Sequence, residues 1–317
     1  MENEWVVHAR MPTITQNCGE FVNKAGCAGA AGYGIISRQN EKKRVNDMAL
    51  QDAKRIVFKV GTSTLTYPNG RLHIRRIEQL VRALSDLKNS GKDVVLVTSG
   101  AIGVGAARLG LDERPRGTRM MQAAAAVGQV ELMYLYDKLF LSYGQVVAQI
   151  LMTRIITDHD NTRQNLINTF ETLLSLGVIP VVNENDSVAV EEIEEEAVAF
   201  GGNDTLSAVV AVLVQADALV LLSDIEGLFD KNPREAPDAR LIPVVESVEQ
   251  VRALAGGAGS LLGTGGMVTK LEAAELVTQN GIDMVIMDGA DPEKLYALFE
   301  GKPVGTYFPA NPKGERA

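Results

Sequence analysis

From residue 54 onward, short apolar runs rich in β-branched residues alternate with segments whose apolar residues recur at helical spacing. The first run covers residues 56–60, and an amphipathic pattern then extends from Ile77 to Leu87 and stops at Gly91. Strands that alternate with helices favour a mostly parallel sheet, so we predict an α/β three-layer sandwich with a central sheet and helices on both faces. The further buried strands are expected at 94–97, 146–151, 178–182, 218–222 and 284–287.

The overall composition is that of a globular protein with a moderate acidic charge. The 317 residues are 46% hydrophobic and carry a formal net charge of -9, so the chain offers no broad basic surface for a nucleic-acid backbone. The most apolar stretch, residues 206–222, contains Ser207, Gln215 and Asp217, which makes it a poor candidate for a membrane span. We therefore expect a soluble, cytoplasmic protein with no nucleic-acid partner and no membrane attachment.

The first 47 residues differ in character from the rest of the chain. They contain Cys18, Cys27 and Trp5, which are all the cysteines and the tryptophan of the sequence, and the small-residue run 25–34 shows neither strand nor helix periodicity. No basic segment followed by an apolar core and a cleavage site is present, so a secretory signal is not indicated. We expect residues 1–47 to be a disordered extension with two reduced thiols rather than a disulfide or a metal clip.

Small and polar residues follow the predicted strands at their carboxyl ends. In a parallel sheet these ends meet at one edge, which is where such folds bind their ligands. Lys59, inside the first strand between apolar neighbours, is expected to be buried and to need an anionic partner. The segments at the strand ends are Gly61-Thr62-Ser63, Thr98-Ser99-Gly100 and Asn183-Glu184-Asn185-Asp186.

Two glycine-rich segments precede predicted helices. The segment 201–205 opens a helix over 205–215 with Asn203 or Asp204 as its N-cap, and the segment 263–270 opens a helix that runs to about residue 280. Exposed backbone N–H groups at a helix N-terminus, followed by a lysine, make a phosphate cradle. Taken alone, a Gly-Gly pair more often indicates a tight turn, and Ser99-Gly100 could equally be a plain N-cap.

Other common site patterns are missing from the sequence. There is no P-loop, and Gly100, Gly103 and Gly105 give GxxGxG instead of the dinucleotide fingerprint GxGxxG. The acid-rich segment 191–196 is expected to be a solvated loop, because adjacent carboxylates repel one another unless a cation fills the site. The histidines share no spacing typical of a metal site or a triad, so no protein metal site is predicted.

Five motifs, in order along residues 53–308, resemble those of bacterial glutamate 5-kinases in the amino-acid kinase superfamily. The motif at residues 263–270, Gly-Thr-Gly-Gly-Met-Val-Thr-Lys, together with Asn-Glu-Asn-Asp at 183–186, separates this group from the aspartate, acetylglutamate, carbamate and uridylate kinases. The resemblance implies that ATP phosphorylates the γ-carboxylate of L-glutamate with Mg²⁺, the first step of proline biosynthesis, and that residues 48–317 form an amino-acid kinase catalytic domain. The motifs cover 59–63, 97–102, 183–186, 202–208 and 263–270.

The resemblance also implies roles for individual residues. Lys59 and Lys270 would neutralise charge on the transferring phosphoryl group, and Asp204 would position both lysines. Glutamate would be held by four polar side chains, namely Ser99, Asp186, Asn203 and Asn183. ATP would contact Lys59, Gly61, Thr62, Ser223, Asp224, Thr264, Gly265, Gly266, Met267, Val268, Thr269 and Lys270.

Two departures from the family pattern accompany the resemblance. Many members carry an aspartate where this chain has Gly202, and the sequence ends near Ala317 without the PUA domain of longer members. Feedback inhibition by proline and a homo-oligomeric state are further expectations. The alternatives are another acyl-phosphate-forming kinase of the same fold, or a nucleotide-binding regulator without turnover.

Overall fold

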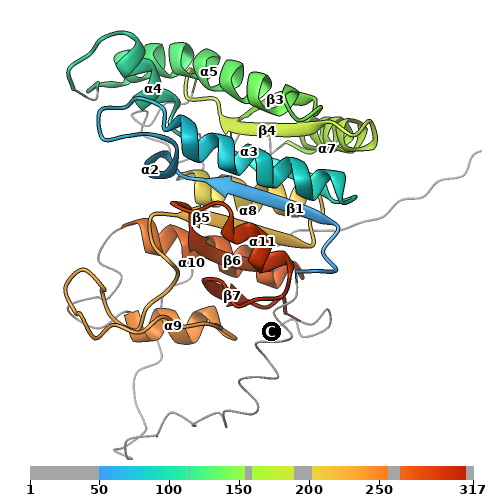
Figure 1. The fold of residues 1–317 in the computed structure, drawn as a ribbon, viewed down its shortest axis with the longest axis vertical. Coiled ribbons are helices and arrows are strands. Elements are labelled where there is room, and N and C mark those ends of the chain that lie inside the picture. The colour runs from blue at the N-terminus through green and yellow to red at the C-terminus, as the bar shows by residue number, and fades with distance from the viewer. Residues whose placement is uncertain (1–49, 114, 154–158, 189–201, 256–264, 312–317) are drawn as a thin grey trace, which may run out of the picture.

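Seven strands form one sheet within the residues that the structure, a computed structural model, describes: 50–113, 115–153, 159–188, 202–255 and 265–311. The strand order is β3-β4-β2-β1-β5-β6-β7 (Figure 1). Neighbouring strands are parallel except for β7, which pairs antiparallel with β6. The strands are β1 (Arg55–Val60), β2 (Asp93–Val97), β3 (Val147–Met152), β4 (Ile179–Glu184), β5 (Ala218–Ser223), β6 (Asp283–Asp288) and β7 (Thr306–Phe308).

Helices cover both faces of this sheet, which confirms the predicted three-layer α/β architecture (Figure 1). One face packs against α3 (Ile74–Asn89), α5 (Thr118–Leu141) and α11 (Lys294–Phe299). The other face packs against α7 (Asp160–Ser175), α8 (Asn203–Leu213) and α10 (Gly265–Gln279). The remaining helices are α2 (Thr62–Leu65), α4 (Ala101–Arg108) and α9 (Val248–Ala255). None of the described helices is long and apolar enough to cross a lipid bilayer.

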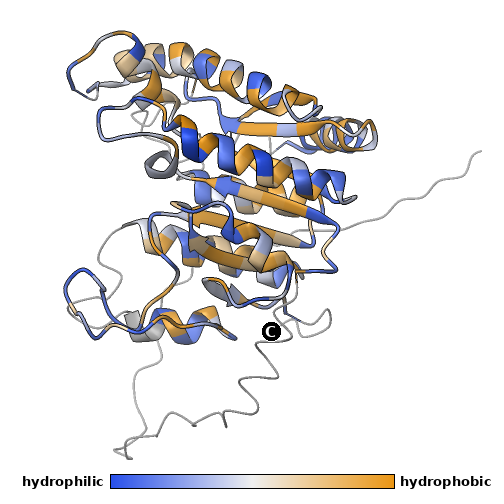
Figure 2. Cartoon of the chain, viewed as in Figure 1, coloured by the Kyte–Doolittle hydropathy of each residue, from blue (hydrophilic) through white to orange (hydrophobic). Residues whose placement is uncertain are grey.

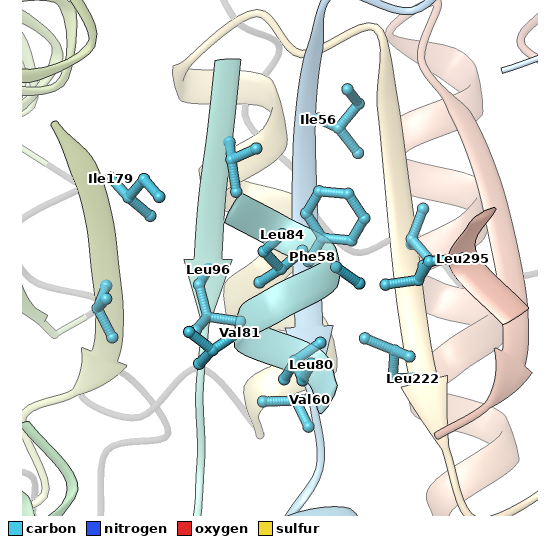
Figure 3. Close-up of a cluster of buried hydrophobic side chains, with 14 of the residues drawn as sticks. Ile56, Phe58, Val60, Leu80, Val81, Leu84, Leu96, Ile179, Leu222 and Leu295 are labelled. Carbon is cyan, nitrogen blue, oxygen red and sulfur yellow. The ribbon is translucent and has the colours of Figure 1, made fainter. Parts of the chain in front are cut away.

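Two hydrophobic cores lie on the two sides of the sheet, because successive strand residues point to opposite faces. Along β1, Ile56, Phe58 and Val60 belong to the core under α3, whereas Val57 belongs to the core under α8 and α10. Figure 3 shows the first core, in which side chains of α3 meet those of the central strands. Figure 2 shows that hydrophobic residues concentrate in the strands, as expected for a sheet buried on both faces.

The six predicted strands are confirmed, with ends that differ by at most two residues. Pro180 lies in β4 without breaking it, because the pairing of β4 with β2 begins only at Val181, so no ladder bond from residue 180 to β2 is lost. The antiparallel β7 was not predicted from the sequence, since three residues carry no periodic signal. Residues 1–47 lie outside the described residues, so the expectation of a disordered extension stays a prediction.

One detail of the predicted α8 is wrong. The helix begins at Asn203, two residues early, and its N-cap is Gly202 with a φ of 119°, not Asn203 or Asp204. Both polar side chains are engaged elsewhere: Asn203 donates to the Thr98 carbonyl, and Asp204 pairs with lysines. Tertiary contacts therefore outweigh local capping at this helix end, and glycine supplies the backbone conformation that the entry into the helix requires.

Helices α4 and α5 cross at a pair of glycines. A Cβ atom on Gly128 would lie 1.9 Å from the carbonyl oxygen of Ala101, and one on Gly105 would lie 1.8 Å from that of Ala124. Real side-chain atoms cannot approach backbone this closely, so the absence of a side chain at both positions sets the distance between the helices. Since α4 begins shortly after β2 ends, this contact also fixes the position of the α4 residues next to the carboxyl end of β2.

We expect Gly128→Ala to destabilise the protein by about 3 kcal/mol or more, because the added methyl group must push two backbones apart. The free energy of unfolding, measured with a chemical denaturant, checks this. Gly103→Ala on α4 is the matched control, because a Cβ atom there has no neighbour within 4 Å. In the control, alanine should leave stability unchanged or raise it by about 0.5–1 kcal/mol. Equal stability of Gly128→Ala and the parent would contradict the close crossing.

Candidate active site

The carboxyl ends of four parallel strands meet at one edge of the sheet and carry the polar segments identified in the sequence. β1 ends before Gly61, β2 before Thr98, β4 at Glu184 and β5 at Ser223. Helix α8 begins beside these ends, because the Asn203 side chain bonds both the Thr98 carbonyl and Asn183. The predicted gathering of these segments at one edge is confirmed.

A buried carboxylate joins two buried ammonium groups at this edge. The Nζ atom of Lys59, in β1, lies 2.6 Å from Oδ1 of Asp204 in α8. The Nζ atom of Lys270, in α10, lies 2.9 Å from Oδ2 of the same carboxylate. The three residues are 6–8% exposed. The anionic partner that the sequence predicted for Lys59 is therefore Asp204. Three elements that are distant in the sequence, β1, α8 and α10, contact one another through this carboxylate.

Two further hydrogen bonds hold this cluster in place. The Thr269 hydroxyl donates to Asp204 Oδ2 at 3.1 Å, and Lys270 Nζ also donates to the carbonyl oxygen of Gly266 at 3.1 Å. Asp204 lies in the first turn of α8, where the helix dipole favours a negative charge. The carboxylate is thus stabilised by its own helix as well as by both lysines.

The electrostatics of the cluster follow from its burial and its charges. Burial lowers the pKa of Lys59, and the nearby Lys270 lowers it further, while the attraction of Asp204 opposes both effects. Burial alone would raise the pKa of Asp204, but the ammonium groups of Lys59 and Lys270 hold the pKa of this carboxyl below its ordinary value. Two ammonium groups around one carboxylate leave one net positive charge, which suits a site for anionic groups.

A cavity of about 1190 Å³ opens beside the cluster. Its wall contains six of the predicted site residues, namely Lys59, Gly61, Thr62, Ser99, Asp186 and Asn203. The Ser99 hydroxyl donates to the Val60 carbonyl at 2.9 Å and does not cap α4, whose N-cap is Gly100. The plain N-cap alternative for Ser99-Gly100 is therefore confirmed for Gly100, whereas the Ser99 side chain does not cap the helix.

Asn183 lies below the cavity and is 1% exposed. Its amide nitrogen donates to Gln129 Oε1 at 2.9 Å, and its oxygen accepts from Asn203 Nδ2 at 3.3 Å. Asn183 thus supports the side chains around it and does not line the cavity itself. The sequence missed Gln129, because no local pattern in α5 marks it and its partner is 54 residues away.

The other predicted nucleotide residues within the described part of the chain lie outside the wall of the large cavity, at the end of β5 and the start of α10. Thr269 and Lys270 contact Asp204 directly, whereas Val268 points outward and is 44% exposed. Ser223 is the last residue of β5 and Asp224 follows it, and the negative charge of Asp224 acts on Lys59. Thr264 lies outside the described residues. Gly265, Gly266 and Met267, which are also in the predicted set, lie in the first turn of α10.

The sequence also missed the segment between α2 and α3. Residues 66–71 line the large cavity together with His73 and Arg76. His73 Nδ1 accepts from the backbone N–H of Arg76 at the start of α3, and its ring stacks on Tyr67 at 4.3 Å. The turn-forming Pro68-Asn69-Gly70 was the available signal, although it indicates a loop and not a binding wall.

Comparison with known proteins places the chain in a family. The model of the amino acid kinase family matches residues 54–288. The glutamate 5-kinase of Clostridium perfringens is 52% identical over 268 residues, which cover 84% of this chain and 99% of that protein. Two solved structures share the fold. An isopentenyl phosphate kinase has a TM-score of 0.57 and 17% sequence identity, and the match covers 80% of this chain and 99% of the other. The UMP kinase of Bacillus anthracis has a TM-score of 0.55 and 15% sequence identity, and the match covers 82% of this chain and 97% of the other. The chain therefore belongs to the amino acid kinase family and, within it, to the glutamate 5-kinases.

Proposed function

We propose that the protein transfers the γ-phosphoryl group of ATP to the γ-carboxylate of L-glutamate, giving ADP and L-glutamyl 5-phosphate, the first step of proline biosynthesis. The observation that carries this function is the buried Lys59–Asp204–Lys270 cluster beside the large cavity, in a chain half-identical to a protein named glutamate 5-kinase. Both reactants are anionic where they meet, so the reaction needs fixed positive charge at that point.

The step itself requires little covalent help from the protein. A carboxylate oxygen of glutamate forms a new bond to the γ-phosphorus while the bond from that phosphorus to the oxygen bridging to the β-phosphate breaks, and ADP leaves with the bond electrons. A glutamate γ-carboxyl is ionised at neutral pH, so no general base is needed. The protein contributes position and electrostatic stabilisation, which are the main sources of rate in phosphoryl transfer.

We assign the electrostatic part to the two lysines. Lys59 and Lys270 would contact phosphoryl oxygens of ATP as negative charge shifts toward the leaving group, and Asp204 would keep both ammonium groups in place and charged. Support comes from the 2.6 and 2.9 Å contacts of Asp204 and from its low pKa, which keeps it ionised. The net charge of the cluster is positive, as a phosphate site requires.

The nucleotide would lie along the first turn of α10 and the end of β5. Gly265 and Gly266 expose backbone N–H groups at a helix N-terminus, which attracts phosphate. We assign further contacts to Thr264, Met267, Val268 and Thr269 around the start of this helix, to Ser223 and Asp224 at the end of β5, and to Gly61 and Thr62 after β1.

Mg²⁺ is proposed as the companion of ATP. The described residues contain no group of three side chains able to ligate a metal, and Mg²⁺ needs none, because phosphate oxygens and water supply most of its ligands. Asp204 is occupied by Lys59 and Lys270, so we assign one possible protein ligand to Asp224, which follows β5 and pairs with the exposed Arg234. When bound, the ion would neutralise charge on the β- and γ-phosphates.

Glutamate would lie on the other side of the cluster, in the large cavity. Asp186 lines the cavity and would pair with the α-ammonium group, and Ser99 and Asn203 would donate or accept hydrogen bonds around the substrate. Asn183 would act from below by fixing the Asn203 amide. Residues 48–317 would form the catalytic domain, a cytoplasmic homo-oligomer that proline inhibits.

An ADP-release assay with several acceptors tests the function against its alternatives. Turnover with glutamate, and none with aspartate, acetylglutamate or UMP, is the expected result. Turnover with another acid alone would favour a different acyl-phosphate-forming kinase, and ATP binding without turnover on any acceptor would favour a nucleotide-binding regulator.

Lys59→Ala and Lys270→Ala should each lower kcat by about 10²–10³-fold while changing the KM for glutamate much less, because both ammonium groups act mainly on charge that develops in the transition state. Steady-state kinetics with both substrates varied checks this. The control is Lys302→Ala, an exposed lysine paired with Glu300, which should leave kcat unchanged. Full turnover by either active-site variant would refute the assignment.

Asp186→Asn should raise the KM for glutamate by about 10-fold or more and leave the KM for ATP nearly unchanged, because the substrate ammonium loses its charged partner. The measurement is the KM of each substrate at saturation of the other. Asp160→Asn, which changes an exposed aspartate paired with Arg163, is the control. Equal effects on both substrates would argue against a place for Asp186 on the glutamate side.

A further inference from the structure

A second, smaller cavity adjoins the large one. It has a volume of about 270 Å³ and shares Ala101, Glu184 and Asp186 with the wall of the large cavity. Gln129, on the inner side of α5, lines this small cavity and is 8% exposed. The Gln129 Oε1 atom accepts from Asn183, whereas its Nε2 atom is buried and has no hydrogen-bond partner within the part of the chain that the structure describes.

The orientation of the Gln129 amide is fixed by a chain of hydrogen bonds. A main-chain carbonyl can only accept, so the Thr98 carbonyl requires the Nδ2 group of Asn203 to face it. The same Nδ2 group then faces Asn183 Oδ1, which turns the Asn183 Nδ2 group toward Gln129. Gln129 must therefore accept this hydrogen bond with its Oε1 atom. Its Nε2 group is then left as a donor without an acceptor among the described residues, at the end of a series of hydrogen bonds that begins at the Thr98 carbonyl.

A buried donor without an acceptor costs about 1–3 kcal/mol, and folded proteins seldom keep one without a reason. The place of Gln129 on the wall of the small cavity suggests that reason. The charged side chains on the wall of the small cavity are Glu184 and Asp186, both acidic. A plain anion would be repelled there, whereas a zwitterion could place its ammonium group at the carboxylates and its own carboxylate at a neutral donor.

We propose that Gln129 determines substrate specificity, and that its Nε2 group donates a hydrogen bond to the α-carboxylate of the amino-acid substrate. The inference rests on the proposed function, which puts the γ-carboxylate at Lys59 and the α-ammonium at Asp186. Asp186 lines both cavities, so the α-carboxylate, on the same carbon as the ammonium, lies within the region that Gln129 bounds. Gln129 thus requires the acceptor to be an α-amino acid and not a simple carboxylic acid.

The test compares two substrates in two proteins. Gln129→Met keeps the approximate length of the side chain and removes the Nε2 donor together with the Oε1 acceptor of Asn183. The kcat/KM for glutamate should fall by about 10–100-fold, mostly through KM, with the KM for ATP unchanged. With 4-aminobutyrate, which is glutamate without its α-carboxylate, parent and variant should differ by less than about twofold. Where 4-aminobutyrate turns over too slowly, its inhibition constant against glutamate gives the same comparison.

Two more variants separate recognition from folding. Gln129→Glu keeps the acceptor for Asn183 but places a carboxylate against the substrate carboxylate. Its KM for glutamate should rise more than in Gln129→Met. This KM should recover partly as the pH falls, because the introduced carboxyl group, once protonated, can donate a hydrogen bond to the substrate carboxylate. Gln122→Met, two turns earlier on α5, should behave like the parent.

Several results would overturn the proposal: an unchanged KM for glutamate in Gln129→Met, an equal loss with glutamate and 4-aminobutyrate, or the same loss in Gln122→Met. Should Gln129→Met fail to melt cooperatively, the pH-dependent recovery of Gln129→Glu decides in its place. If the parent protein does not phosphorylate glutamate, the proposed function itself fails, and that outcome is distinct from a loss of specificity in an active parent.

Discussion

The rest of the site depends on one buried carboxylate that lies between two buried ammonium groups. Asp204 joins β1, α8 and α10 through Lys59 and Lys270, so the proposed glutamate site and the proposed nucleotide site are held together by a single carboxylate. Burying three charges is costly unless each is paired. The cluster meets that condition and still keeps one positive charge in excess, which a phosphoryl group would balance during transfer.

A series of hydrogen bonds links the Thr98 carbonyl to the side-chain amides of Asn203, Asn183 and Gln129, and we propose that it orients the groups that bind the amino acid. It is neutral, it runs below the large cavity, and each bond in it sets the orientation of the next side chain. The Gly105 and Gly128 contact holds α5 against α4, which keeps Gln129 at a fixed distance from the strand ends. In the proposed function, the charge for the phosphoryl group and the oriented neutral donors for the amino acid therefore come from different elements, which meet at Asn203 and Asp204.

The sequence predicted what depends on local pattern, and it missed what depends on contacts between distant segments. Six strands, their parallel arrangement and the polar segments at their ends follow from periodicity, and the need of Lys59 for an anion follows from its apolar neighbours. The N-cap of α8 could not be predicted, because Asn203 and Asp204 are used by partners from other elements. Gln129 and the two crossing glycines have no local signature, since their roles exist only once α5 has packed.

The measurement that tests the central claim most directly is the single-turnover rate of phosphoryl transfer by Asp204→Asn at saturating ATP and glutamate. The variant keeps the shape of the side chain and removes the charge that holds both lysines. We predict a rate at least about 100-fold below that of the parent, in a protein that still melts cooperatively and still binds ATP. A folded variant whose rate stays within about threefold of the parent would show that the Asp204 cluster is not the centre of the reaction.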